Sequence, residues 1–132
     1  MNSKIHKKRT ILIIDDSEEL LDVLEPALKK CGYNVVVKSA PGNIEVFVQK
    51  TKIDLMLLDV RLENVSGKFI CNELKSNPKT DYFPIILISA FAKYAASYKE
   101  CGADDFLEKP FNLDELITKV NVQVHAHESH KN

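Results

Sequence analysis

Short apolar runs alternate with longer amphipathic segments along the chain. The runs are Ile11–Ile14, Val35–Val37, Ile53–Leu58, Ile85–Ile88 and Phe106–Leu107. A strand that is apolar throughout is covered on both faces, whereas a strand that alternates has one face in water. We therefore expect the first, third and fourth runs to be central strands of a parallel sheet, and the two shorter runs to be its edges.

The segments between the runs carry apolar residues at helical spacing, so a helix is expected after each strand. Asn112 and Glu115 match a capping box for the last helix. Gly32 and Gly102 are placed to end the first and the fourth. Pro26 lies inside the first helix, where it costs about 3 kcal/mol, and we expect a kink there. The residues that share a helix face are Leu20, Leu24 and Leu28; Ile44, Phe47 and Val48; Ile70 and Leu74; and Leu113, Leu116, Ile117, Val120 and Val124.

Five strand-helix repeats predict an α/β fold, a doubly wound five-stranded parallel sheet with helices on both faces. Among doubly wound topologies we choose the flavodoxin-like strand order 2-1-3-4-5. The 132 residues suffice for one domain. We expect a basic lead over residues 1–9, the domain over 10–125 and a flexible tail over 126–132.

Composition restricts the class of protein. A formal net charge of −1, with 28% charged residues, gives no bulk attraction to nucleic acid or to an anionic membrane. No apolar stretch is long enough for a signal peptide or a membrane span. Cys31, Cys71 and Cys101 are odd in number and widely spaced. This spacing argues against a disulfide framework and a zinc site, and favours a reducing cytoplasm.

Polar side chains follow four of the five predicted strands at the points where the strands end. Asp15 and Asp16 follow the first strand, Asp59 ends the third, Ser89 ends the fourth and Lys109 follows the fifth. The carboxyl ends of parallel strands lie at one edge of a sheet, where ligands of open α/β sheets bind. These five side chains are therefore expected to converge.

Three carboxylates that converge on one lysine leave a surplus of negative charge. Two like charges roughly 4 Å apart repel by about 1 kcal/mol in water and about 4 kcal/mol at an effective dielectric constant of 20. Mg²⁺ suits such a site, because it accepts a few carboxylates and keeps several waters. A carboxylate beside a metal and a lysine is also placed to attack phosphorus.

Each of these residues has a simpler explanation when it is taken alone. Asp16 is suited to cap the first helix, and Ser89 to cap the fourth. Asp59 is suited to a turn, and Lys109 to a solvated loop. The coincidence of all of them at one sheet edge favours a shared site.

Four segments resemble the receiver family of two-component response regulators. They are Ile13–Ser17, Leu57–Asp59, Ile88–Ala90 and Gly102–Phe111, in this order and each at the end of its strand. The similarity extends over nearly the whole chain. It implies a chemotaxis-regulator-like phosphorelay switch that is not an enzyme in the ordinary sense, since it catalyses only its own phosphorylation and dephosphorylation.

The resemblance also implies residue roles. Asp59 would accept a phosphoryl group from a histidine kinase or phosphotransfer protein, with Lys109 and Ser89 in contact with that group. Phe106 matches the switch aromatic, which turns inward once Ser89 has moved. The further implied features are the Mg²⁺ ligands Asp15 (largely through water), Asp16, Asp59 and the backbone carbonyl of Arg61, and a cis peptide bond between Lys109 and Pro110.

Some positions depart from the family's common pattern or bear on it. The family often has Tyr where this chain has Phe106. Phe has no hydroxyl to prefer water, so we expect its inward rotamer before phosphorylation. Glu63 stands where a proline is common. Arg61 and Phe91 occupy positions that modulate the lifetime of the phosphorylated state, in a direction that the sequence leaves open.

The implied contact surface for a downstream protein combines the fourth predicted helix, the fifth strand and the last helix. No output module follows in these residues, so we expect output through a protein partner or a homodimer, although a fragment of a longer regulator would have the same sequence. Direct contact with nucleic acid or membrane is not expected.

Other functions remain open. A receiver-like interaction domain that does not switch would share the fold. A phosphatase-like hydrolase would have D-x-D after the first strand, where this chain has Asp15–Ser17. A flavin-binding module needs a loop rich in Gly, Ser or Thr at the same place. The histidines His125, His127 and His130 could bind a metal, but a frayed, solvated end has the same pattern.

Overall fold

The computed structural model of the chain describes residues 8–130, with side chains through residue 127. In chain order the elements are β1 (Thr10–Ile14), α1 (Glu18–Lys30), β2 (Asn34–Lys38), α2 (Ile44–Lys50), β3 (Leu55–Asp59), α3 (Gly67–Lys75), β4 (Ile85–Ser89), the 3₁₀ helices η1 (Ala92–Ala96) and η2 (Tyr98–Cys101), β5 (Asp105–Glu108) and α4 (Leu113–His130).

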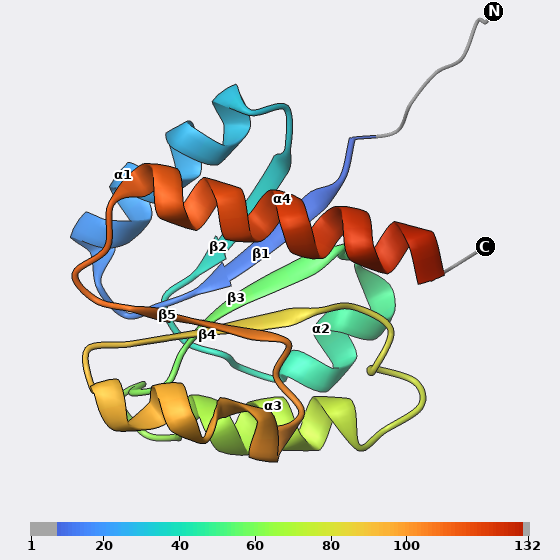
Figure 1. Ribbon diagram of the computed structural model, residues 1–132. Helices are drawn as coiled ribbons and strands as arrows, with labels where there is room; N and C mark the ends of the chain where they lie inside the picture. Colours follow the sequence, from blue (N-terminus) through green and yellow to red (C-terminus); the bar gives the residue numbers. More distant parts are fainter. Residues whose placement is uncertain (1–7, 131–132) are drawn as a thin grey trace, which may run out of the picture.

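All five strands are parallel and form one sheet in the order β2-β1-β3-β4-β5. In the middle of the sheet Ile13 lies opposite Val37 on one side and Leu57 on the other. Helices α1 and α4 cover one face, and α2 and α3 cover the other (Figure 1). The predicted doubly wound α/β fold with a flavodoxin-like strand order is therefore confirmed.

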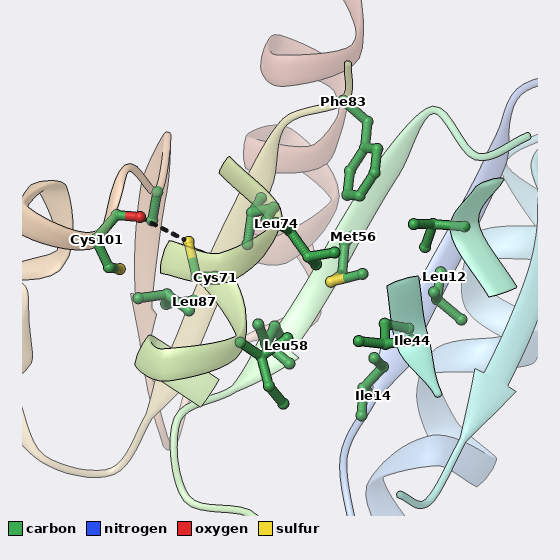
Figure 2. Close-up of a cluster of buried hydrophobic side chains, with 14 of the residues drawn as sticks. Leu12, Ile14, Ile44, Met56, Leu58, Cys71, Leu74, Phe83, Leu87 and Cys101 are labelled. Carbon is green, nitrogen blue, oxygen red and sulfur yellow. Dashed lines mark hydrogen bonds between the residues drawn. The ribbon is translucent and has the colours of Figure 1, made fainter. Parts of the chain in front are cut away.

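The central strands are buried on both faces, as the unbroken apolar runs predict. All five residues of β3 and of β4 are buried, whereas the edge strand β2 has none fully buried. Successive side chains enter different cores, because residues of a strand point alternately to its two faces. Ile11 and Ile13 pack toward α1 and α4, while Leu12 and Ile14 pack toward α2 and α3 (Figure 2).

Side chains close the amino ends of the helices. The Ser17 hydroxyl accepts a hydrogen bond from the Leu20 N–H at 3.2 Å, so Ser17 caps α1 and the explanation of Asp16 as a cap is wrong. At α4, Asn112 accepts from the Glu115 N–H at 2.7 Å, as the predicted cap requires. A cap of this kind contributes about 1 kcal/mol.

Glycines end two helical segments in the left-handed conformation, as predicted. Gly32 follows α1 with φ of 96°, and Gly102 follows η2 with φ of 91°. Pro26 lies inside α1, and the helix continues through it to Lys30. The kink expected at Pro26 stays a prediction.

The predicted fourth helix is wrong as an α-helix. Residues 92–101 form the two short 3₁₀ helices η1 and η2 instead. No residue of η1 is buried, and Cys101 is the one buried residue of η2. Most helical stability in proteins comes from burying an apolar face, and this segment buries only Cys101 fully, with Tyr94 and Tyr98 half-buried. Short 3₁₀ pieces are the usual result in such connections.

The two ends of the predicted domain are partly described. Residues 1–7 of the basic lead lie outside the described residues, and Arg9 pairs with Asp54 at 3.6 Å. Helix α4 continues past the predicted domain end at residue 125, as far as His130. Residues 131–132 lie outside the described part, and the flexibility of the tail stays a prediction. Among the helices of residues 8–130, none is long and apolar enough to cross a membrane.

Gly67, the first residue of α3, supports a testable prediction about the stability of the fold. A Cβ atom at Gly67 would lie 2.9 Å from the carbonyl carbon of Asp59 and closer still to its oxygen. Backbone cannot move aside as a flexible side chain can, so we expect Gly67→Ala to lower the free energy of unfolding by about 2 kcal/mol or more. Urea denaturation monitored by circular dichroism measures this change.

Gly32→Ala is the matched control for this substitution. It meets no atom within 4 Å and strains only the positive φ, so a smaller loss of about 1 kcal/mol is expected. Equal losses for the two variants would show that the contact with Asp59 is not what fixes glycine at position 67.

Candidate functional site

The five polar side chains predicted to converge come from the carboxyl edge of the sheet. Asp15 and Asp16 follow β1, Asp59 ends β3, Ser89 ends β4 and Lys109 follows β5. Three of them are almost fully buried, with exposed fractions of 1% for Asp15, 5% for Asp59 and 1% for Ser89. Asp16 is exposed at the rim. The sheet therefore brings together residues that are up to 94 positions apart.

Backbone groups orient the two buried carboxylates. Oδ1 of Asp15 accepts the Ser17 N–H at 2.9 Å, and Oδ1 of Asp59 accepts the Arg61 N–H at 3.2 Å. The turn explanation of Asp59 is thus correct as local structure, but it uses only one of the two carboxylate oxygens. The second oxygen of each carboxylate faces Lys109.

The Lys109 ammonium group forms an ion pair with both buried carboxylates. Its Nζ lies 3.0 Å from Oδ2 of Asp15 and 3.6 Å from Oδ2 of Asp59. A solvated loop lysine is therefore the wrong explanation of this residue. The peptide bond from Lys109 to Pro110 is cis, as the resemblance implies.

One ammonium group does not balance the acidic cluster. Carboxylate oxygens of Asp15, Asp16 and Asp59 lie within 4.8 Å of one another. Burial raises the pKa of Asp59 above its ordinary value, and the charge of Asp15 raises it further. Lys109 and the Arg61 N–H oppose this shift without cancelling it. A cation bound at the cluster would therefore be favourable, because it would neutralise the remaining negative charge.

The donor set of this cluster fits Mg²⁺. Hard cations prefer carboxylate and carbonyl oxygens, and Mg²⁺ binds through one or two carboxylates while it keeps several waters. The rim position of Asp16 leaves the cluster open to solvent on that side. Asp15, Asp16 and Asp59 could hold such an ion.

Ser89 and Phe106 lie on neighbouring strands beside the cluster. The Ser89 hydroxyl accepts the Phe91 N–H at 3.0 Å, and the Ser89 carbonyl accepts the Lys109 N–H at 2.8 Å. Phe106 is 8% exposed, and its ring stacks on Tyr98 with centroids 6.2 Å apart. Phe106 is therefore largely buried, and its role as a switch with an inward rotamer before phosphorylation stays a prediction.

Some site features were not predicted from the sequence. The Arg61 guanidinium lies 4.8 Å from the centre of the Phe91 ring, which in turn meets Tyr94 edge to face. The Lys68 ammonium group lies over the Tyr94 ring, 5.3 Å from its centre. These contacts join the loop after β3 and the start of α3 to η1. Only the positions of Arg61 and Phe91, two residues after Asp59 and Ser89, signalled them.

The histidine pattern near the end of the chain falls partly outside the described side chains. His125 Nδ1 makes a 2.8 Å hydrogen bond with the Asn121 carbonyl inside α4. His130 lies beyond the last described side chain. The possibility of a histidine metal site stays a prediction.

Comparisons with known proteins agree with this fold. A chain from Chloroflexus aurantiacus J-10-fl, provisionally classed as a response regulator, shares 28% sequence identity and a TM-score of 0.84. The match covers 90% of this chain and 99% of that one. A CheY-like response regulator receiver domain protein from Methanospirillum hungatei JF-1 has 22% identity and a TM-score of 0.85, over 94% of this chain and 99% of that one.

A third similar structure is an assembly. It is the beryllofluoride-activated dimer of the NtrC4 receiver domain in solution, with 22% identity, a TM-score of 0.80, and coverage of 89% of this chain and 98% of that one. At 22% identity, the similarity of the second and third structures to this chain shows a shared fold alone. The model of the response regulator receiver domain family matches residues 11–121. The chain therefore belongs to the family of response regulator receiver domains, the signalling switches of two-component systems.

Proposed function

We propose that this chain is a phosphoacceptor switch, in which Asp59 takes a phosphoryl group from a histidine kinase or phosphotransfer protein with Mg²⁺ bound beside it. The observation that carries this proposal is the buried Asp59 carboxylate, 3.6 Å from the Lys109 ammonium and clustered with Asp15 and Asp16. Receiver domains interact with histidine kinases or phosphotransfer proteins, and the family typically binds Mg²⁺.

The cation site is the first part of the proposal. Asp16, Asp59 and the Arg61 carbonyl would hold Mg²⁺, with Asp15 acting largely through water. When bound, the ion supplies positive charge for the phosphoryl oxygens. The chain's own groups do the rest: backbone N–H groups keep Asp15 and Asp59 oriented, so little reorganisation is needed at the moment of transfer.

Phosphoryl transfer is the second part. A carboxylate oxygen of Asp59 forms a bond to phosphorus while the bond from phosphorus to the donor histidine nitrogen breaks. Lys109 already lies beside Asp59, and it would stabilise the charge of the transferred group. Ser89, at the end of the adjacent strand β4, would donate a hydrogen bond to a phosphoryl oxygen.

A cleft beside the site gives the phosphodonor protein a place to bind. It has a volume of about 530 Å³ and lies between α1 and the loop from β5 to α4. Leu20, Val23, Phe111 and Leu113 make its lining mostly apolar, and Lys109 reaches its edge. An exposed apolar surface rimmed by polar groups is typical of a protein interaction site. We assign it to the donor.

Signal output is the third part. Phosphorylation can shift the two-state equilibrium only if it binds one arrangement of the switch better than the other. We assign the switch to Ser89 and Phe106, which flank η1 and η2 in the chain. The readable surface would combine η1, η2, β5 and α4, for a protein partner or a second copy. Some receiver domains dimerise.

Nothing in this geometry favours the interaction domain that does not switch, since the three carboxylates and Lys109 lie together at the site. We also place the protein in a reducing cytoplasm, on the odd number and wide spacing of its three cysteines. Contact with nucleic acid is not part of the proposal.

Phosphorylation gives the first test. With Mg²⁺ and acetyl phosphate, the intact mass should rise by one phosphoryl group, because the Asp59 carboxylate is the acceptor. Asp59→Asn and a chelated sample should show no addition. Asp114→Asn, which alters an exposed carboxylate on α4, should behave as wild type. Addition to Asp59→Asn would place the acceptor elsewhere, and no addition to wild type would favour the non-switching domain.

Mg²⁺ binding can be measured through stability. A ligand present at 100 times its Kd stabilises the folded state by about 2.7 kcal/mol. We expect thermal unfolding of wild type to show a stabilisation of this size, and Asp16→Asn to need much more Mg²⁺ for the same effect. Asp16 is exposed, so its substitution spares the core. Equal Mg²⁺ dependence of Asp16→Asn and wild type would contradict the assigned ligand.

The raised pKa of Asp59 predicts a pH dependence in the presence of chelator. Below the ordinary value of 3.8 the carboxyl group is protonated whether the chain is folded or not, so Asp59→Asn should match wild type. As pH rises through the higher pKa of the folded state, wild type loses stability and the variant does not. The variant should therefore melt at a higher temperature at pH 7, as scanning calorimetry would show. A lower melting temperature would mean that Lys109 outweighs burial.

A further inference from the structure

Cys71 and Cys101 form a pair of thiols outside the acidic site. Cys71 lies in α3 and Cys101 ends η2, 30 positions later in the chain. Their exposed fractions are 0% and 6%, and both belong to the core between the sheet and α3. Cys31, at the end of α1, is exposed. The reactivity of the buried pair can therefore be compared with that of an exposed thiol in the same chain.

The two cysteines meet where α3 and η2 touch. The Cys71 thiol donates to the Cys101 carbonyl at 3.5 Å, and Figure 2 shows the two residues side by side at one end of the core. The contact continues at Lys75, one helical turn after Cys71, and Gly102, which follows Cys101. A Cβ atom on Gly102 would lie 3.0 Å from Cβ of Lys75. The Cys101 thiol donates to the Tyr98 carbonyl at 3.2 Å, so its side chain must leave that hydrogen bond before the two sulfurs can bond.

The surroundings protect the Cys71 thiol while η2 is packed. Burial, and then the neighbouring Cys101, raise the pKa of the Cys71 thiol well above its ordinary range. Because the thiolate is the reactive form, the buried thiol resists oxidation. However, η2 is a short 3₁₀ helix with only one buried residue, so it belongs to the segments that open at low free energy. Local opening of η2 would expose Cys101 without unfolding the sheet.

We propose that Cys71 and Cys101 are a reversible dithiol–disulfide site that clamps η2 to α3. With hydrogen peroxide as oxidant, the Cys101 sulfur attacks one peroxide oxygen, the O–O bond breaks and water leaves, which gives a sulfenic acid. The Cys71 sulfur then attacks that sulfur, the S–S bond forms, and the S–O bond breaks with loss of a second water. Two thiols are oxidised, and one peroxide is reduced to two waters.

The clamp would bear on the switch. Tyr98 lies in η2, three residues before Cys101, and stacks on Phe106. A disulfide from Cys101 to α3 would hold Tyr98 in place and keep Phe106 buried. This consequence rests on the proposed phosphorylation switch, whereas the disulfide itself does not.

The test uses the full chain with Cys31→Ser, which removes the exposed thiol. The folded protein is treated with hydrogen peroxide, the oxidant is removed with catalase, and free thiols are alkylated after denaturation. We expect most chains to lose two hydrogens in intact mass, and digestion to give a peptide that links Cys71 to Cys101. Dithiothreitol should restore both alkylated thiols. The double variant with Cys71→Ala should give no such peptide.

Three outcomes would overturn the proposal. Both thiols could stay fully alkylated after peroxide, the cross-link could form only in urea, or Cys101 could pass to sulfinic acid with Cys71 untouched. Cys101→Ala in the same background guards against a misfolded control, since either alanine must abolish the link. No phosphodonor is present, so a failure here leaves the Asp59 proposal standing, and a failure at Asp59 leaves this one standing.

Discussion

The burial of negative charge at one edge of the sheet is the constraint on which the site depends. Asp15 and Asp59 are nearly inaccessible to water, and Lys109 is the ammonium group that neutralises part of their charge. Burying a charge costs several kcal/mol unless it is paired and hydrogen-bonded. Backbone N–H groups and Lys109 meet that cost only in part, so the three carboxylates could hold a cation, as the proposed function requires.

The rest of the fold holds this imbalance in place. Strands β1, β3 and β4 are packed on both faces, so the residues at their ends cannot separate to relieve repulsion. Gly67 lets the start of α3 approach the Asp59 carbonyl, which no side chain at that position would permit. Close-packed interiors of this kind transmit strain and do not absorb it. A structural change at the acidic site is therefore expected to displace the segments that are less well packed.

Those parts are η1 and η2, which begin three residues after Ser89 and end at Cys101 in the α3 core. The Arg61–Phe91 contact and the Tyr98–Phe106 stack hold this segment at its two ends. A phosphoryl group would act on it from the side of Ser89, and a disulfide would act on it from the side of Cys101. The two proposed chemistries thus bear on one weakly packed segment, and neither requires the sheet to move.

The sequence determined the sheet, its central strands and the five side chains at its edge, because unbroken apolar runs occur only where a strand is covered on both faces. It also predicted the cap at Asn112 and the stops at Gly32 and Gly102, which depend on local geometry. Tertiary structure alone decided that residues 92–101 are not an α-helix, since that depends on what they can bury. It also decided that Lys109 pairs with both carboxylates and that Cys71 meets Cys101. Such contacts join distant parts of the chain, and no local pattern records them.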